Sequence, residues 1–459
     1  MHIVAVGGSD AGISAALRAR EVEPGAEVTV VAADAYPNFS ICGIPYYVSG
    51  EVGHWRNLAH RTIADLEAAG MTLRLDTTAR RIDVPGRKLL VTVPGGAEEL
   101  IGYDQLVIGT GAVPVRPPIA GLDALGADDG VHLLHSMGDT FALMRTLERA
   151  APRSAVITGA GYIGLEMADA LITRGLAVTQ LERLPEVLPT VDPELGGLVH
   201  AELAARGVSV LTGTAVTAVG RAPAGAPGRL CVEVMAGDGE PVTRFADIVL
   251  VVVGVRPDTE LAVSAGASLG ARGAIAVDRR MRTGLPDVYA AGDCVVTQHR
   301  LLGETYLPLG TTAHKQGRVA GENAAGGDRE FAGSLGTQVV KIFDQAAART
   351  GLRDHEARAA GYDPVTVAWH ADDHKAYYPG SHRIAMRFTG DRRTGRLLGA
   401  QLFGHKEAEV AKRIDVAATA IFHAMTVDEV SDLDLSYTPP LGSPWDAIQA
   451  GAQAWTRLS

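Results

Sequence analysis

Two stretches of the chain share one pattern of apolar and polar positions. Each has a short apolar strand, a glycine-rich turn, an alanine-rich helix and a second apolar strand. The first runs through HIVAVGGSDAG, a helix near residues 13–20 and the strand EVTVVAA. The second runs through SAVITGAGYIG, a helix near residues 165–174 and the strand AVTQLE. Each pattern predicts a strand–helix–strand unit that binds a nucleotide, so we expect two bound dinucleotides.

The pattern changes from about Phe331 onward. Alternating strands are predicted there, followed by a helix from Glu407 to about Met425. The predicted strands are VVKIF, TVAWH, RIAMRF and LLGAQLFG. This succession of strands before a helix is typical of an α+β domain.

Two breaks rich in proline and glycine separate these patterns. They cover residues 113–126 and 253–258, and such stretches are typical of crossings between domains. A chain of 459 residues suggests about three domains at roughly 150 residues each. We therefore predict an α/β protein with two Rossmann-like dinucleotide-binding domains and a C-terminal α+β domain.

Charge and hydropathy argue against two classes of partner. The net charge is −11 at pH 7, and there is no cluster of five or more Lys and Arg residues, so a nucleic-acid partner is not expected. The longest apolar run, around residues 248–253, is far shorter than the ~20 residues that cross a bilayer and predicts a buried strand. Met1 leads directly into an apolar strand without the features of a signal peptide. We expect a cytoplasmic protein without a membrane partner.

The turn of the second unit has the complete glycine spacing of a dinucleotide site. Gly159, Gly161 and Gly164 let the backbone approach a pyrophosphate at a helix N-terminus, whose free N–H groups attract anions. Glu182 ends the following strand, where a carboxylate bonds ribose hydroxyls and repels a 2′-phosphate. The adjacent Arg183 weakens this preference slightly. NADH is therefore favoured over NADPH.

The turn of the first unit is less regular. Ser9 replaces the middle glycine, and two alanines precede Asp34 where an acid is expected at the end of the second strand. We expect Asp34 to bond the ribose of the first dinucleotide. The candidate contacts in the turn itself are Gly7, Ser9, Asp10, Ala11 and Gly12.

Two further motifs carry a resemblance to a known family. The segments GTGAVP at residues 109–114 and DVYAAGDC at residues 287–294 make the chain resemble the pyridine nucleotide-disulfide oxidoreductases over essentially its whole length. The resemblance implies FAD in the first site and NAD(P)H in the second, with Asp293 on the ribityl chain of the flavin and Glu166 near the flavin and the nicotinamide. The other cofactor contacts that we expect are Thr110, Gly111, Tyr162, Ile163, Gly254 and Gly292.

The same resemblance implies the domain limits and the assembly. Residues 1–118 and 248–328 are expected to form a discontinuous FAD-binding domain, and residues 119–247 the NAD(P)H-binding domain. Residues 329–459 are expected to form a dimerisation domain. We expect a homodimer in which each subunit completes the site of the other.

The segment around Cys42 narrows the resemblance. Most disulfide reductases of the family carry Cys-x4-Cys, but Tyr47 occupies the second cysteine position here. The segment NFSICGIPYYVSG resembles the single-cysteine branch, which includes coenzyme A-disulfide reductases, NADH oxidases, NADH peroxidases and persulfide reductases. Cys231 and Cys294 are interpreted as inert small apolar residues. Three scattered cysteines provide neither a disulfide framework nor a zinc site, so no metal is expected.

Local sequence also suggests how Cys42 is positioned. Pro45 suits the first turn of a short helix that Gly50 ends, which places Cys42 near a helix N-terminus. We expect this position to favour the thiolate.

Tyrosines are the candidate acids that protonate a departing thiolate. The His and Glu pair of glutathione reductase-like members is absent, and DLSYTPPLGSPWD resembles the coenzyme A-disulfide reductase version, in which a tyrosine, here Tyr437, reaches the cysteine of the partner subunit. A second family tyrosine falls on Tyr377 or Tyr378 in AYYPG. A purely structural role, with these tyrosines packing a dimer interface, remains open.

The main hypothesis is reduction of a low-molecular-weight disulfide such as coenzyme A disulfide, through a mixed disulfide with Cys42. Arg18 and Arg20 on the first helix are candidate contacts for coenzyme A.

Three alternatives stay open. An NADH oxidase or peroxidase would cycle Cys42 through sulfenic acid, although Asp10 stands where those enzymes usually carry a histidine. A coenzyme A persulfide or polysulfide reductase would use a very similar site. A flavin-bearing redox sensor without turnover is the non-enzymatic alternative.

Overall fold

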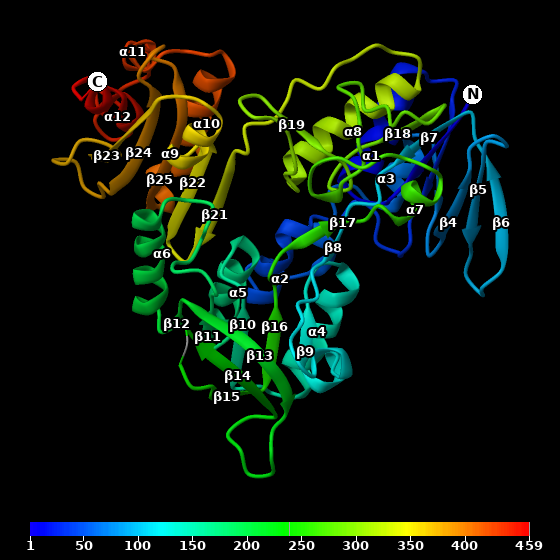
Figure 1. The fold of residues 1–459 in the computed structure, drawn as a ribbon, viewed down its shortest axis with the longest axis horizontal. Coiled ribbons are helices and arrows are strands. Elements are labelled where there is room, and N and C mark those ends of the chain that lie inside the picture. Colours follow the sequence, from blue (N-terminus) through cyan, green and yellow to red (C-terminus); the bar gives the residue numbers. More distant parts are fainter. Residues whose placement is uncertain (238, 459) are drawn as a thin grey trace.

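The computed structural model describes residues 1–237 and 239–458, which form three units built around sheets (Figure 1). Two of these units contain a parallel five-stranded sheet, and the third contains an antiparallel five-stranded sheet. Both predicted strand–helix–strand units are present, as is the C-terminal α+β unit. The predicted fold class is therefore confirmed.

The first sheet has the strand order β18-β7-β1-β2-β3. Helices α1 and α8 pack closely, because glycines of α8 bring no side chain to the contact: a Cβ at Gly321 would lie 2.0 Å from the carbonyl oxygen of Ala15. A three-stranded antiparallel sheet, β4-β5-β6, lies beside this unit (Figure 1). The elements are β1 (His2–Val6), α1 (Asp10–Val22), β2 (Glu27–Val31), η1 (Ile41–Gly43), α2 (Ile44–Ser49), η2 (Trp55–Leu58), α3 (Ile63–Ala68), β3 (Met71–Arg74), β4 (Thr78–Asp83), β5 (Lys88–Thr92), β6 (Glu98–Gly102), β7 (Gln105–Ile108), α7 (Glu260–Ser264), β18 (Val288–Ala290), β19 (Thr297–His299), β20 (Gly303–Thr305) and α8 (Gly310–Ala324).

The second sheet has the order β12-β11-β10-β16-β9, and an antiparallel sheet, β13-β14-β15, accompanies it. The elements are β9 (Val131–Leu133), α4 (Met137–Arg149), β10 (Ser154–Thr158), α5 (Tyr162–Thr173), β11 (Ala177–Leu181), α6 (Pro193–Ala205), β12 (Ser209–Leu211), β13 (Thr214–Arg221), β14 (Leu230–Ala236), β15 (Val242–Ala246) and β16 (Ile248–Val251).

The structure corrects the domain boundary that we expected at residue 248. Strand β16 lies between β10 and β9 and pairs with both in parallel, so it belongs to the second sheet. Its four residues are all buried, which is the environment that this apolar run requires. The chain enters the second unit after β8 (Ala112–Pro114) and leaves it through β17 (Val255–Pro257), and these two strands pair antiparallel.

The third unit is an antiparallel sheet in the order β21-β22-β25-β24-β23, with α10 and α12 packed on it. The predicted helix at 407–425 is shorter than expected, because a 3₁₀ turn precedes α10 and Glu409 adopts a left-handed conformation between them. The elements are β21 (Gln338–Ile342), β22 (Gln345–Gly351), α9 (Asp354–Ala359), β23 (Pro364–Asp372), β24 (Arg383–Asp391), β25 (Leu397–His405), η6 (Lys406–Ala408), α10 (Val410–Phe422), α11 (Val427–Ser431) and α12 (Ala447–Thr456).

Lys341 on β21 joins all three units. Its Nζ lies 2.9 Å from Oδ2 of Asp169 on α5 and 3.1 Å from Oε1 of Glu51, which follows α2. The same oxygen of Asp169 accepts the backbone N–H of Phe343 at 2.9 Å. Asp169 is buried, so its charge is compensated by a cation and a backbone donor, as a buried carboxylate requires.

Across the described ranges 1–237 and 239–458, no helix combines the length and the apolar character needed to cross a membrane.

Candidate active site

One cavity of about 2990 Å³ connects the two glycine-rich turns. It is lined by Cys42 and by most of the cofactor contacts expected from the sequence. These lining residues are Gly7, Ser9, Asp10, Asp34, Thr110, Gly111, Gly159, Gly161, Tyr162, Ile163, Glu166, Glu182, Gly254 and Asp293. Ala11, Gly12, Gly164 and Gly292 are not among its lining residues. The two units thus place both turns and one thiol around a common space.

The first turn is shaped by close backbone contacts. Gly7 has φ +114°, and a Cβ there would lie 2.0 Å from the carbonyl oxygen of Gly109. A Cβ at Gly12 would lie 2.0 Å from the carbonyl oxygen of Gly7. Ser9 caps α1 in an extended conformation, φ −107°, which any residue adopts. This conformation explains why the middle glycine is dispensable here.

The N-terminus of α1 is open to an anion. The side chain of Ser9 makes no capping hydrogen bond, so the first N–H groups of α1 are available to a ligand. Asp34 lines the cavity beyond β2, and its Oδ1 accepts the N–H of Tyr36 at 2.9 Å. This turn, with an acid at the end of the following strand, fits the pyrophosphate and ribose of FAD.

The second turn combines tight packing with open space. A Cβ at Gly164 would lie 2.0 Å from the carbonyl oxygen of Gly159, whereas no atom lies within 4 Å of a Cβ at Gly161. Glu182 directly follows β11 and is buried. Its Oε2 accepts the N–H of Ala160 and its Oε1 that of Leu184, each at 2.8 Å. The carboxylate is therefore fixed beside the turn.

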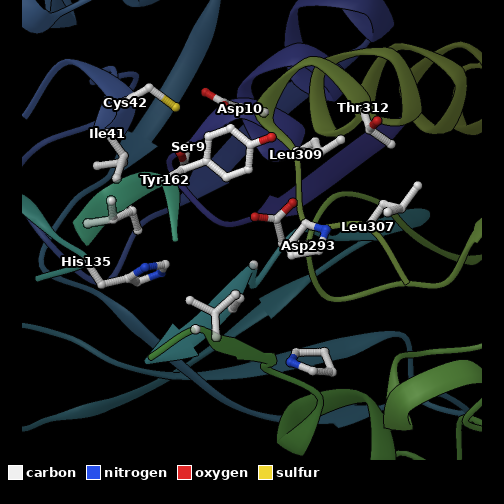
Figure 2. A pocket seen from close by; sticks show the side chains of 18 of the residues that line it. Ser9, Asp10, Ile41, Cys42, His135, Tyr162, Asp293, Leu307, Leu309 and Thr312 are labelled. Atoms are coloured by element: carbon white, nitrogen blue, oxygen red, sulfur yellow. The ribbon is translucent and has the colours of Figure 1, made fainter. Parts of the chain in front are cut away.

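Cys42 lies in η1, directly before α2, and its side chain faces the cavity (Figure 2). The predicted short helix is confirmed: Pro45 is in its first turn, and Gly50 ends it with φ +93°. Figure 2 also shows the ring of Tyr162 projecting into the space between Cys42 and Asp293.

The surroundings of Cys42 oppose the expected preference for the thiolate. Desolvation raises the pKa of the Cys42 thiol, and the charges of Glu166, Asp10 and Asp293 raise it further. Helix α2 has only six residues, so its N-terminal dipole is outweighed by desolvation together with three carboxylates. A base that accepts the thiol proton would therefore assist Cys42 as a nucleophile.

The other cysteines lie elsewhere. Cys294 is completely buried, with its Sγ 3.4 Å from the carbonyl oxygen of Ala291. Cys231 lies on β14, with its Sγ 3.6 Å from the carbonyl oxygen of Arg221. Cys42 is thus the only cysteine lining the cavity within residues 1–237 and 239–458.

Two carboxyl groups in the cavity have strongly shifted pKa values. Desolvation raises the pKa of Glu166 to about 7, although the hydroxyl of Tyr46 donates to its Oε1 at 3.0 Å and opposes this shift. Desolvation, followed by the charge of Asp10, raises the pKa of Asp293 to about 7. The sequence analysis missed Tyr46, although its position in the helix after Cys42 was a signal that it lies near the site.

The shifted pKa of Glu166 leads to a prediction on stability. A carboxyl whose folded-state pKa is raised contributes stability that is present below its usual pKa and is lost as pH rises through about 7. We expect Glu166→Gln to reduce this loss, because the amide stays neutral and still accepts from Tyr46. The measurement is the thermal unfolding midpoint of the FAD-loaded protein between pH 5 and pH 8. Glu148→Gln on the exposed side of α4 is the control, and an identical pH dependence in Glu166→Gln and wild type would contradict the prediction.

The predicted tyrosines lie outside this cavity, on the surface of the third unit. Tyr377 is 74% exposed, Tyr378 43% and Tyr437 45%. Their two segments meet where the N–H of Lys375 donates to the carbonyl oxygen of Pro439 at 3.4 Å. Within one subunit, the tyrosines are thus grouped together but apart from Cys42.

The predicted coenzyme A contacts are engaged elsewhere. Arg18 pairs with Glu322 at 2.7 Å and with Glu21 at 2.8 Å. Arg20 donates to the carbonyl oxygens of Pro24 and Ala26. The structure does not bring either guanidinium to the lining of the cavity.

The fold and the two nucleotide turns define a flavin- and nicotinamide-dependent oxidoreductase. Comparison with known proteins gives the particular family. Residues 1–317 match the pyridine nucleotide-disulphide oxidoreductases, and residues 337–447 match the dimerisation domain of that family. The chain belongs to this family, whose members bind FAD and NAD(P)H.

Individual relatives cover nearly the whole chain. An NAD(P)H sulfur oxidoreductase (CoA-dependent) of Pyrococcus furiosus is 35% identical over 448 residues, covering 97% of each chain. An NADH oxidase of Methanocaldococcus jannaschii is 32% identical and covers 99% of this chain and 98% of its own. The structure of an NAD-dependent persulfide reductase from A. fulgidus superposes with a TM-score of 0.92 at 36% identity, covering 100% of this chain and 83% of the other.

Proposed function

We propose that the protein uses NADH to reduce a low-molecular-weight disulfide such as coenzyme A disulfide, through a mixed disulfide with Cys42. The observation that carries the proposal is a single exposed thiol in the cavity that connects the two nucleotide turns. One sulfur at this place forms a disulfide with a substrate thiol and not with a second protein cysteine. The coenzyme A dependence in the name of the P. furiosus relative supports the substrate class.

The proposal assigns a role to each side of the cavity. The first turn and the N-terminus of α1 hold the pyrophosphate of FAD, Asp34 binds its ribose, and Asp293 binds its ribityl chain. The second turn holds the pyrophosphate of NADH. FAD, when bound, passes electrons from the nicotinamide to the sulfur site. Cys42 attacks one sulfur of the substrate, releases the first thiol and retains the second until its own bond is reduced.

Glu182 is proposed to set the preference for NADH. Two backbone N–H groups already fix its carboxylate, so a 2′-phosphate would meet a rigid negative charge. We expect Glu182→Gln to shift the ratio of kcat/KM for NADPH over NADH towards NADPH by about tenfold, because one opposing charge at short range is removed. The measurement is steady-state kinetics with both coenzymes. A ratio that does not change would contradict this role, and Glu186→Gln, the nearby acid paired with His200, is the control.

A homodimer is proposed to complete the site. The match to the dimerisation domain and the clustering of exposed tyrosines on the third unit support it. In this assembly, Tyr437 and either Tyr377 or Tyr378 approach Cys42 of the partner subunit and donate to a departing thiolate. A cytoplasmic location is part of the same proposal and is consistent with a free thiol as the working group.

Reduction of a coenzyme A persulfide is the second candidate function. The 36% identical persulfide reductase structure favours it, and the chemistry at Cys42 is again attack on a sulfur–sulfur bond. The deciding experiment compares NADH oxidation by the FAD-loaded protein with coenzyme A disulfide, coenzyme A persulfide, hydrogen peroxide and oxygen. Fast turnover with a sulfur substrate supports the proposal and identifies the substrate. Turnover with peroxide or oxygen alone would replace it with an oxidase function.

A further inference from the structure

Three titratable side chains form a group that includes the cavity-lining Asp10 and has no role in the sulfur chemistry proposed above. Asp10 begins α1, His314 lies on α8, and His60 lies between η2 and α3. One imidazole nitrogen or carboxylate oxygen from each lies within 4.8 Å of those of the other two. The rings of His60 and His314 are 6.0 Å apart at 76°. Three separate segments of the first unit thus converge on one point.

His314 is oriented at both of its nitrogens. Its Nδ1 lies 2.8 Å from Oγ of Ser14, and its Nε2 lies 3.4 Å from Oδ1 of Asp10. The other oxygen of Asp10 fits against the start of α8 because residue 310 is glycine: a Cβ at Gly310 would lie only 3.0 Å from it. A histidine held between a hydroxyl and a carboxylate has a fixed ring orientation, which is a requirement for directed proton transfer.

Asp10 connects this group to Cys42. Both side chains line the cavity, and Figure 2 shows the sulfur of Cys42 and the carboxylate of Asp10 pointing toward each other. The charge of Asp10 acts on the thiol, as do those of Glu166 and Asp293. The carboxylate of Asp10 has both imidazoles within reach on its other side, and His60 is the exposed one of the two.

We propose that Asp10 and His314, with His60 leading to solvent, form the proton relay that serves Cys42. In the disulfide reaction, the relay takes the proton from the thiol, and the thiolate attacks one sulfur of the substrate. The Cys42–sulfur bond forms, the substrate sulfur–sulfur bond breaks, and the first departing thiolate receives the proton back from the relay. The tyrosines of the partner subunit then serve the second thiol, which leaves when the mixed disulfide is reduced. The step is a balanced exchange of one thiol for another. This proposal rests on the proposed function for its substrate, and His314 and His60 are positioning residues that act through Asp10.

The relay is tested with two disulfides that differ in whether their departing thiolate must be protonated. An alkyl thiolate such as that of coenzyme A is basic and must be protonated, whereas an aromatic thiolate leaves unprotonated. In Asp10→Asn and His314→Gln, we expect turnover of coenzyme A disulfide to fall about 100-fold, as general acid–base catalysis contributes. Turnover of dithiobis(nitrobenzoate) falls by less, about tenfold, because its leaving group needs no acid and only the removal of the Cys42 proton loses its base. His200→Gln, in a His–Glu pair outside the cavity, behaves as wild type.

FAD content is measured in every variant, and rates are expressed per bound FAD, because Asp10 also belongs to the turn expected to hold FAD. The rate of FAD reduction by NADH stays at the wild-type level, because the relay serves the reaction at sulfur. Equal losses on the two disulfides, or no loss on either, would overturn the proposal.

A second measurement does not depend on the substrate. The rate at which iodoacetamide alkylates Cys42 in the reduced enzyme follows the thiolate fraction, so its pH profile reports the pKa of the thiol. Because the negative charge of Asp10 raises that pKa, Asp10→Asn shifts the profile to lower pH, although the same variant turns over coenzyme A disulfide more slowly. An unshifted profile would overturn the relay. If wild-type enzyme reduces no disulfide, the proposed function fails while this profile still tests the relay.

Discussion

Replacing Cys42 with serine is expected to reduce NADH-dependent turnover of disulfides or persulfides by about 1000-fold or more, because a hydroxyl is far less acidic and forms no disulfide. Reduction of FAD by NADH is expected to continue, since the two nucleotide turns are untouched. Stopped-flow absorbance of the flavin and steady-state NADH oxidation measure the two steps separately. Loss of both steps, or of neither, would contradict the assignment of Cys42 as the sulfur centre.

Cys231→Ser is the matched control for this variant. Cys231 lies on β14, outside the cavity, and its Sγ makes only a weak contact of 3.6 Å with a backbone carbonyl. We expect it to retain both steps. Cys294 is unsuitable as a control, because it directly follows Asp293 and its buried sulfur contacts the carbonyl oxygens of Ile108 and Ala291.

Two glycines of the second turn are expected to respond in opposite ways to alanine. In Gly164→Ala, the new Cβ would lie 2.0 Å from the carbonyl oxygen of Gly159, so the backbone must shift. We expect a loss of about 3 kcal/mol in the free energy of unfolding, at the upper end for overpacking in a well-packed site. In Gly161→Ala, no atom lies within 4 Å of the new Cβ, so stability changes by less than about 0.5 kcal/mol.

Gly161→Ala instead tests coenzyme binding. Gly161 is the N-cap of α5 and lines the cavity, so its methyl group would occupy the place of the pyrophosphate. We expect KM for NADH to rise about tenfold, a loss of about 1.4 kcal/mol of binding. Denaturant unfolding and steady-state kinetics on both variants separate the two effects. Two variants with the same profile would show that the turn does not bind the coenzyme in this way.

Local sequence predicted the features that depend on neighbouring residues. The glycine spacing at residues 159–164 correctly predicted the second turn. Pro45 and Gly50 correctly predicted the start and the end of α2. These features are predictable because backbone sterics and helix ends depend on a few consecutive residues. Most of the cofactor contacts inferred from the family resemblance line one cavity. They were predictable for the same reason, because they lie in such turns.

Features that depend on distant residues were missed. Burial raises the pKa of Cys42, and carboxylates at positions 10, 166 and 293 raise it further; no local pattern shows that these groups meet. Strand β22 has the sequence QAAARTG, whose small side chains give little hydrophobic alternation although most of them are buried between β21 and β25. The boundary at residue 248 was misplaced because an apolar run does not reveal which sheet it joins.

Lys341 has a consequence for the exchange of domains between relatives. Because its ammonium group binds Asp169 of the second unit and Glu51 of the first, the nicotinamide-binding unit is not an independent module. A chimera that imports this unit without an acid at position 169 would leave the backbone N–H of Phe343 without its acceptor and Lys341 with Glu51 as its remaining partner. Recombination within the family is therefore expected to transfer these positions as a set, and designed hybrids should do the same.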